Sequence, residues 1–247
     1  MRFAVLSDVH ANLTAFEAVL ADMDEQGVDR ALHLGDIVGY GPDPEECVNL
    51  MRARSIPSVL GNHEQAMLSD KAKRWFNTSS RKAVDITDSL ISEETRQWLA
   101  TLPTSIAFDR YRFVHGFPKD NAFFYLYQAN NEKLEQAFSS MVMAICFVGH
   151  THMLEHVEWD GLEVSRKELP LGRTRLNPLA KHILNVGSVG QPRDDFNYHA
   201  KYVLFDADVW DIEVRSVEYD YQSVARRIIA RGIPGTYAMR LSGPGNL

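Results

Sequence analysis

Short apolar runs alternate with amphipathic stretches over the first sixty residues, and this pattern constrains the fold more than any other feature. Phe3–Leu6 is typical of a buried strand, and the helical spacing of apolar residues from Leu13 to Met23 predicts a helix that ends at Gly27. The next expected elements are a strand at Ala31–Leu34, a helix at Pro44–Arg54 and a strand at Ile56–Leu60. This β-α-β-α-β order predicts parallel strands with right-handed crossovers.

The pattern then becomes helical from about residue 64 to 102, with Trp75 and Phe76 among its apolar anchors. We expect a helical cap insertion packed over a site, within a single domain that spans residues 1–247. Trp75 could equally belong to the core of the cap itself. Further strands are expected at Ser105–Phe108, Arg112–His115, Ala144–Val148, Glu155–Trp159, Leu162–Ser165, Ile183–Val186, Tyr202–Phe205 and Ile212–Val217, and helices at Glu132–Ser139 and Tyr221–Ala230.

Composition excludes several classes of protein. The net charge of −7 argues against a nucleic-acid-binding surface. No apolar run approaches the roughly 18 residues that span a bilayer, and Phe3–Leu6 is too short for the core of a signal peptide. Cys47 and Cys146 are expected to be buried and unpaired. We therefore expect a cytoplasmic protein that binds neither membranes nor nucleic acids; the oligomeric state is left open.

Polar motifs follow five of the apolar runs, at the points where strands give way to loops. They are Asp8-Val9-His10, Gly35-Asp36, Gly61-Asn62-His63-Glu64, His115-Gly116 and Gly149-His150-Thr151-His152. In an open α/β sheet, ligands gather beyond the carboxyl ends of the strands, so these segments can converge on one site. The neighbouring glycines permit close approach of the backbone.

The residue types in these motifs indicate a metal centre. If the backbone stays extended, the side chains of Asp-x-His and of His-x-His share a face and can reach one ion or two adjacent ions. Carboxylate, amide and imidazole ligands suit divalent manganese, iron, cobalt or zinc. A single Asp-x-His is more often a turn or an ion pair, so the prediction depends on the five segments together.

In this order, the motifs resemble those of the calcineurin-like metallophosphoesterase superfamily, in particular its small bacterial and archaeal phosphodiesterase-like branch. Asn185-Val-Gly-Ser-Val-Gly-Gln-Pro-Arg193 resembles a loop of that branch too. The resemblance implies a four-layer α/β/β/α sandwich, two mixed sheets flanked by helices. It also implies a hydrolase of small-molecule phosphate mono- or diesters, nucleotides among them, with two divalent ions. Manganese is the first expectation, and iron, zinc, cobalt and nickel are alternatives.

The resemblance also implies a role for each motif residue. Asp8, His10 and His152 would hold one metal; Asn62, His115 and His150 would hold the other; and Asp36 would bridge them. A hydroxide between the metals would attack phosphorus in line, and His63 would protonate the leaving oxygen.

One departure from the family narrows the function. The superfamily's Ser/Thr phosphoprotein phosphatases carry an Asp-Arg pair where this chain has Gly39-Tyr40. This disfavours a phosphoprotein phosphatase and leaves His63 without an assigned orienting partner. Candidate substrate contacts are Asn12, Asn77, Arg81 and Arg193, with Phe76 roofing the centre. A non-catalytic scaffold with the same fold is the contrasting alternative, although the chain lacks none of the expected site residues.

Overall fold

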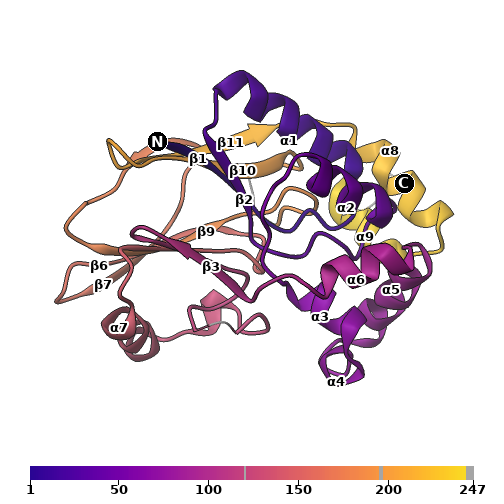
Figure 1. The fold of residues 1–247 in the computed structure, drawn as a ribbon, viewed down its shortest axis with the longest axis horizontal. Helices are drawn as coiled ribbons and strands as arrows, with labels where there is room; N and C mark the ends of the chain where they lie inside the picture. Colours follow the sequence, from indigo (N-terminus) through magenta and orange to yellow (C-terminus); the bar gives the residue numbers. More distant parts are fainter. Residues whose placement is uncertain (120, 195–196, 243–247) are drawn as a thin grey trace.

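A computed structural model describes residues 1–119, 121–194 and 197–242 (Figure 1). The described strands form two mixed sheets. The first has the order β2-β1-β10-β11-β8 and contains β1 (Arg2–Leu6), β2 (Arg30–His33), β8 (Gly172–Arg175), β10 (Ala200–Asp206) and β11 (Asp211–Val217). The second has the order β3-β4-β5-β9-β6-β7 and contains β3 (Ser105–Phe108), β4 (Tyr111–Val114), β5 (Ile145–Val148), β6 (Leu154–Trp159), β7 (Val164–Glu168) and β9 (Lys181–Val186).

Alternation along β1 shows how the layers stack. Phe3 and Val5 enter the apolar layer between the two sheets, whereas Ala4 and Leu6 face the helices on the outer side of the first sheet. The helices packed in that outer layer are α1 (Leu13–Gln26), α2 (Pro44–Ala53), α8 (Tyr221–Ala230) and α9 (Gly235–Ser242). A four-layer α/β/β/α sandwich results, as predicted.

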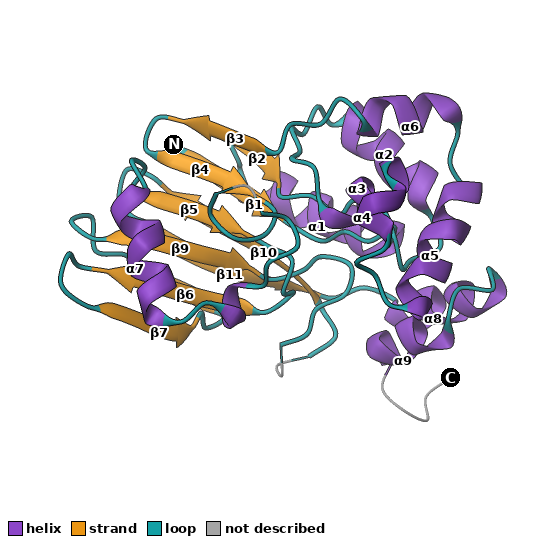
Figure 2. Cartoon of the chain, turned by 90° about the horizontal axis from the view of Figure 1, so that it is seen from below, coloured by secondary structure: helices purple, strands orange, loops and turns teal. Residues whose placement is uncertain are grey.

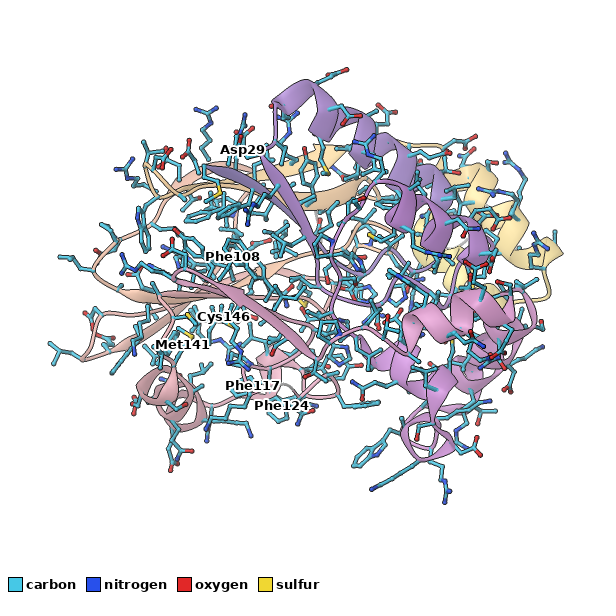
Figure 3. All side chains as sticks on the ribbon, in the orientation of Figure 1. Asp29, Phe108, Phe117, Phe124, Met141 and Cys146 are labelled. Carbon is cyan, nitrogen blue, oxygen red and sulfur yellow. The ribbon has the colours of Figure 1, made fainter. Side chains whose placement is uncertain are left out.

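The outer face of the second sheet is covered by α7 (Asn131–Ser140), which follows the short 3-10 helix η1 (Leu126–Gln128) (Figure 1). Met141, at the end of α7, and Cys146, on β5, lie in the apolar layer between them (Figure 3). Cys47 is likewise buried, and the two cysteines do not form a disulfide, as predicted.

The segment proposed as a cap is built from helices that lie together beyond one end of the sheets (Figure 2). They are α3 (Asn62–Leu68), α4 (Asp70–Lys73), α5 (Thr78–Ser89) and α6 (Glu93–Leu99). Side-chain caps fix two of their starts: Asn77 accepts from the Ser80 amide and Ser92 accepts from the Thr95 amide. Helices thus fill the segment 64–102, and α3 begins two residues earlier.

The predicted third strand at Ile56–Leu60 is wrong. Only Ser58 forms an isolated bridge, with His33, and Pro57 has no amide hydrogen with which to extend a ladder. The first sheet is mixed and not purely parallel, because β1 pairs parallel with β2 and antiparallel with β10. Among the described residues, no helix is long and apolar enough to cross a membrane.

Candidate metal centre

All eight motif residues predicted to form the centre converge beyond the carboxyl ends of the central strands. Asp8 and His10 follow β1, Asp36 follows β2, His115 follows β4, and His150 and His152 follow β5, while Asn62 and His63 begin α3. Each of these residues is at most 5% exposed. A cluster of carboxylates and imidazoles removed from water in this way is costly unless its charges are balanced inside the site.

At three of the motifs, the backbone departs from the extended form that was the condition for paired side chains to share a face. Asp8 and His10 have φ values of 55° and 49°, and His150 and His152 have values of 66° and 63°. All four residues therefore have left-handed conformations, as does Asp36 with φ 59°. The backbone therefore turns at these three motifs, and their side chains still reach the same space without the extended geometry considered from spacing alone.

Backbone carbonyl oxygens fix the orientation of three histidines. Nδ1 of His10 donates to Val38 O at 3.1 Å, Nδ1 of His115 to Leu34 O at 2.8 Å, and Nδ1 of His152 to Gln191 O at 2.6 Å. A carbonyl oxygen only accepts, so the ring hydrogen lies on Nδ1. In the neutral ring, each Nε2 then carries a lone pair that faces the centre, an arrangement typical of histidines that bind metals.

The first group of candidate ligands is formed by Asp8, His10 and His152. Nε2 of His10 lies 3.1 Å from Nε2 of His152, and Asp8 Oδ1 lies 3.6 Å and 3.3 Å from these atoms. In the neutral rings, two lone pairs face each other and a carboxylate oxygen. Ligand atoms that share an ion at about 2.0–2.2 Å are separated by about 3 Å, so these three side chains fit a divalent cation.

The second group of candidate ligands is formed by Asp36, Asn62, His115 and His150. His115 Nε2 lies 2.8 Å from Asn62 Oδ1, 3.2 Å from His150 Nδ1 and 3.3 Å from Asp36 Oδ2. Burial opposes a positive charge on His115, but the neighbouring Asp36 carboxylate overcomes it and raises the pKa to about 9. A position where the protein attracts a proton this strongly also suits a metal ion.

Asp36 joins the two groups. Its Oδ2 lies 3.6 Å from His10 Nε2 as well as 3.3 Å from His115 Nε2, and its Oδ1 accepts from the His63 amide at 2.9 Å. Burial opposes ionisation of Asp36, but the surrounding histidines hold its pKa well below the ordinary value. The carboxylate therefore stays charged at the one position that faces both groups.

Glu64 supports Asp36, although the sequence reasoning assigned it no role. Its buried carboxylate accepts from the amides of Asp36, Val38 and Gly61 at 2.9, 3.2 and 2.9 Å. Burial and the nearby Asp36 raise the pKa of Glu64 to about 7. Glu64 thus holds the Asp36 loop against the start of α3, and its place in the Gly-Asn-His-Glu motif was the available signal.

His63 lies beside both groups, and packing rather than a hydrogen bond orients its ring. Its ring centroid is 4.3 Å from that of Tyr40 and 4.8 Å from those of His10 and Phe76. Nδ1 of His63 is buried without a partner among the described residues and faces Gly39. Burial lowers the pKa of His63, and Asp36 opposes that shift. A phosphate beside the ring would add negative charge and oppose it further.

The remaining predicted contacts differ in what they offer a substrate. Asn12 caps α1, and its amide group also donates to Gly190 O and Tyr219 Oη, so it is part of the protein framework. Asn77 caps α5, and Arg81 donates to the carbonyls of Phe76 and Arg74. Arg193 differs from these, because its amide donates to His152 O and its charge acts on Tyr40, Tyr125 and His152 in the centre.

An aromatic cleft of about 550 Å³ opens next to the centre. Asn62 and His150 form its base, and its other lining residues come from the cap and from the 121–128 segment: Trp75, Phe76, Asn121, Phe123, Phe124, Tyr125 and Gln128. The Tyr125 ring stacks on the His150 ring at 4.1 Å. Trp75 is 77% exposed, so it is not part of the core of the cap, whereas Phe76 packs with Ala66 and Val84.

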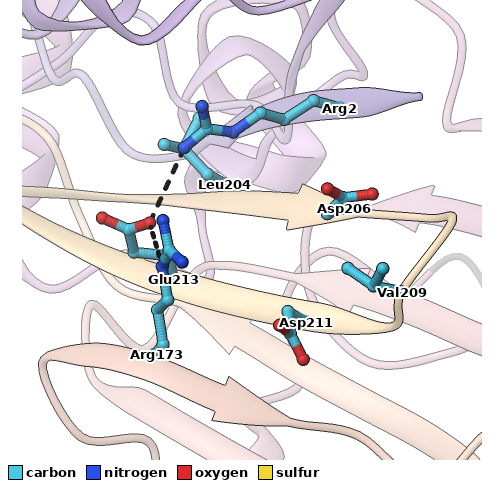
Figure 4. A pocket seen from close by; sticks show the side chains of 7 residues that line it. All are labelled: Arg2, Arg173, Leu204, Asp206, Val209, Asp211 and Glu213. Atoms are coloured by element: carbon cyan, nitrogen blue, oxygen red, sulfur yellow. Dashed lines mark hydrogen bonds and ion pairs between the residues drawn. The ribbon is translucent and has the colours of Figure 1, made fainter.

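A different hollow lies at the far end of the first sheet. It is lined by Arg2, Arg173, Leu204, Asp206, Val209, Asp211 and Glu213 (Figure 4). Glu213 forms ion pairs with Arg173 at 3.0 Å and with Arg2 at 3.6 Å, so these three charged side chains of the hollow are paired with one another. The histidine and carboxylate centre, not this hollow, concentrates ligand atoms that lack partners.

The chain is similar to several known proteins. A family model described as the calcineurin-like phosphoesterase superfamily domain matches residues 1–209. The uncharacterized protein MJ0912 of Methanocaldococcus jannaschii is 35% identical over 243 residues, which cover 96% of each chain. A crystal structure of a metallophosphoesterase from Sphaerobacter thermophilus is 36% identical, with a TM-score of 0.83 and 98% of each chain covered. Hypothetical protein PH1004 from Pyrococcus horikoshii OT3, 20% identical with 97% of each chain covered and a TM-score of 0.78, shares the fold.

Proposed function

Since the chain belongs to the calcineurin-like phosphoesterase superfamily, we propose that it is a dinuclear metal-dependent hydrolase of small-molecule phosphate mono- or diesters. The observation that carries the proposal is the pair of Nε2 atoms of His10 and His152, 3.1 Å apart with their lone pairs facing each other. Asp8 Oδ1 also lacks a hydrogen-bond partner among the described residues. Burying so many acceptors without a donor is unfavourable unless cations complete the site.

The proposed ligands divide as the motifs suggest: Asp8, His10 and His152 for one ion, Asn62, His115 and His150 for the other, and Asp36 for both. Two divalent ions held there, manganese first and iron, zinc, cobalt or nickel as alternatives, would shield the phosphate charge and lower the pKa of an attacking water. Asp36 contributes the carboxylate that balances charge between the two groups.

The chain's own groups would then handle the substrate. We infer that the Arg193 guanidinium holds a phosphoryl oxygen, since a planar cation suits phosphate and its charge already reaches the centre. His63 would donate a proton to the leaving oxygen, because its ring lies against His10 and beside Asp36.

The aromatic cleft supports an ester whose organic group is flat. Trp75 and Phe123 line the cleft with aromatic rings, and base stacking on aromatic side chains contributes about 1–3 kcal/mol. A nucleotide or an aryl ester would place its ring there while its phosphate reaches the centre. The cleft leaves room for the second substituent of a diester, as its volume lies within the usual range for ligand sites.

Reconstitution tests the central claim. Metal-free protein is loaded separately with manganese, iron, cobalt, nickel or zinc and assayed on an aryl monoester, an aryl diester and a phosphopeptide. Turnover of the small esters with at least one metal is expected. Folded protein that turns over none of them would support the non-catalytic scaffold, and a preference for the phosphopeptide would support a protein phosphatase.

The cleft has its own test. Trp75→Ala should raise KM for a nucleotide ester several-fold more than for a methyl ester, because only the former stacks. Leu179→Ala is the control, since Leu179 is 93% exposed and lies outside the cleft. Equal effects of Trp75→Ala on both esters would refute stacking in the cleft while leaving the metal-dependent hydrolysis intact.

A further inference from the structure

A second group of metal-ligating side chains lies on the second sheet, where β6 and β9 are neighbours. His156 and Glu158 lie two residues apart on β6, so their side chains share a face of the sheet. His182 of β9 is paired directly with Glu158 in the antiparallel register. The same face turns toward the first sheet. Leu184, opposite His156, belongs to the apolar layer between the sheets, and the Trp210 ring lies 6.3 Å from that of His182.

This group is separate from the candidate metal centre. His182 is the second residue of β9, whereas the loop that contacts the centre follows the other end of that strand, next to the cap (Figure 2). Glu158 and His182 are paired four residues along the ladder from Leu154 and Val186, the pair next to His152, which at about 3.3 Å per extended residue is roughly 13 Å. No atom of this group can share an ion with the centre.

The ligand atoms have spacings that suit one ion. Nε2 of His156 lies 2.9 Å from Nδ1 of His182, and Glu158 Oε2 lies 3.9 Å and 3.5 Å from these two atoms. Tetrahedral ligands at about 2.0–2.1 Å from zinc are separated by about 3.3 Å. The observed distances bracket that value, so small side-chain rotations would suffice.

The orientation of His182 is already fixed for coordination. Its Nε2 donates to Asn177 O at 2.9 Å, and a carbonyl oxygen only accepts, so Nδ1 carries the lone pair. A backbone carbonyl on the remote ring nitrogen is the usual outer partner of a metal-binding histidine. Burial lowers the pKa of His182 and lowers that of His156 to about 3, so both rings are neutral at neutral pH.

His156 is only 1% exposed, and its Nδ1 has no partner among the described residues. Without a metal, Nε2 of His156 must donate to Nδ1 of His182. Nδ1 of His156 is then an acceptor without a partner among the described residues. On coordination, the ring hydrogen would move to Nδ1 and both facing lone pairs would be used. The Glu158 side chain is 25% exposed, which opens the group to solvent on one side.

We propose that His156, Glu158 and His182 bind a zinc ion, with water from the open side as a fourth ligand. Two imidazoles and one carboxylate without a thiolate are a ligand set that zinc accepts. Such an ion would tie β6 to β9 and to the Asn177 turn, and would stabilise the end of the sandwich away from the centre. Lys167, opposite His156 on β7, places a positive charge near both rings and opposes the ion.

Zinc bound per chain, measured by mass spectrometry after equilibrium dialysis of metal-free protein, tests the proposal. Wild type and Glu163→Gln should bind one zinc ion more than Glu158→Gln. Both variants remove one carboxylate charge from the same hairpin, but Glu163 is exposed in its turn. Loss of a direct ligand should weaken binding at this site by more than the 10–100-fold typical of lost outer partners. Manganese-supported ester hydrolysis should be the same in all three proteins.

Equal zinc contents in wild type, Glu163→Gln and Glu158→Gln would overturn the proposal and leave a hydrogen-bonded histidine pair. Lys167→Gln provides a second test in a protein with all three ligands intact. It should bind this zinc several-fold more tightly, because a repelling charge is removed. An unchanged zinc affinity in Lys167→Gln, with unfolding in chelator like that of wild type, would also contradict the site.

Discussion

Gly39 provides a direct test of how His63 is positioned. Its φ is 89°, and a Cβ atom there would lie 2.1 Å from His63 Nδ1. Since ordinary contacts begin near 3.4 Å, Gly39→Ala would force the imidazole to retreat by about 1.3 Å. Misplacing a catalytic group by about 1 Å can cost about 100-fold in rate, and complete loss of a general acid costs about 10²–10⁴-fold.

We therefore expect Gly39→Ala to lower kcat about 100-fold on an ester with an alkyl leaving group, which needs a proton. The loss on a nitrophenyl ester should be several-fold at most, because nitrophenolate leaves without one. Bound metal should stay near the wild-type level, since none of the proposed ligands is touched.

Gly172→Ala is the matched control for backbone strain. Gly172 has a similar φ of 83°, but a Cβ atom there meets no atom within 4 Å. Both substitutions carry the left-handed strain of about 1–2 kcal/mol, and only Gly39→Ala displaces His63. Equal losses on alkyl and nitrophenyl esters, or a loss no larger than that of Gly172→Ala, would refute packing against Gly39 as the device that positions the proton donor.

Four further outcomes are expected. Asp36→Asn should lose most bound metal by elemental analysis, because the amide no longer balances the charge between the two ligand groups. Arg193→Gln should raise KM about 10–100-fold, the worth of a hydrogen bond to a charged group, with metal content unchanged. Burial lowers the pKa of His33 to about 3, so its contribution to stability is complete above the unfolded pKa near 6.5 and is lost as the pH falls from there toward 3. In urea titrations of metal-free protein, His33→Gln should reduce that acid sensitivity by up to about 1.4 kcal/mol per pH unit. Phe147→Ala should destabilise by about 3–5 kcal/mol in urea, since its ring is fully buried and stacks on Phe113 at 5.1 Å.

The sequence was most informative where chemistry and local structure coincide. Each motif follows an apolar run directly, so Asp36 and His150 could be placed at strand ends without knowing how the strands pair. The four layers came from the family resemblance rather than from periodicity. The apolar run Ile56–Leu60 led to the wrong prediction of a strand, because a run that contains Pro57 can be buried without joining a sheet.

Two elements, β8 and α9, were not predicted, because their positions depend on tertiary contacts that leave no local pattern in the sequence. β8 (Gly172–Arg175) is a mostly exposed edge strand whose charged side chains pair with β11, so it shows no apolar run. α9 was missed as well, although it bears directly on the site. Its Tyr237 ring stacks on Tyr40 at 4.2 Å, and Tyr40 in turn packs on His63. The orienting partner of His63 is thus the stack of Tyr40 and Tyr237. These two residues are so far apart in the sequence that spacing alone cannot reveal their contact.

The left-handed conformation of five proposed ligands connects the stability of the fold with its chemistry. At about 1–2 kcal/mol each, Asp8, His10, Asp36, His150 and His152 together store about 5–10 kcal/mol, which is comparable to the whole stability of a typical domain. Short polar side chains reduce this strain, and backbone bonds such as His10 N to Asp36 O at 2.9 Å oppose it. An ion that binds only the folded state stabilises it further by mass action. On the proposed function, the turns that aim these side chains inward would be most stable with ions bound, and metal affinity and folding would depend on the same residues.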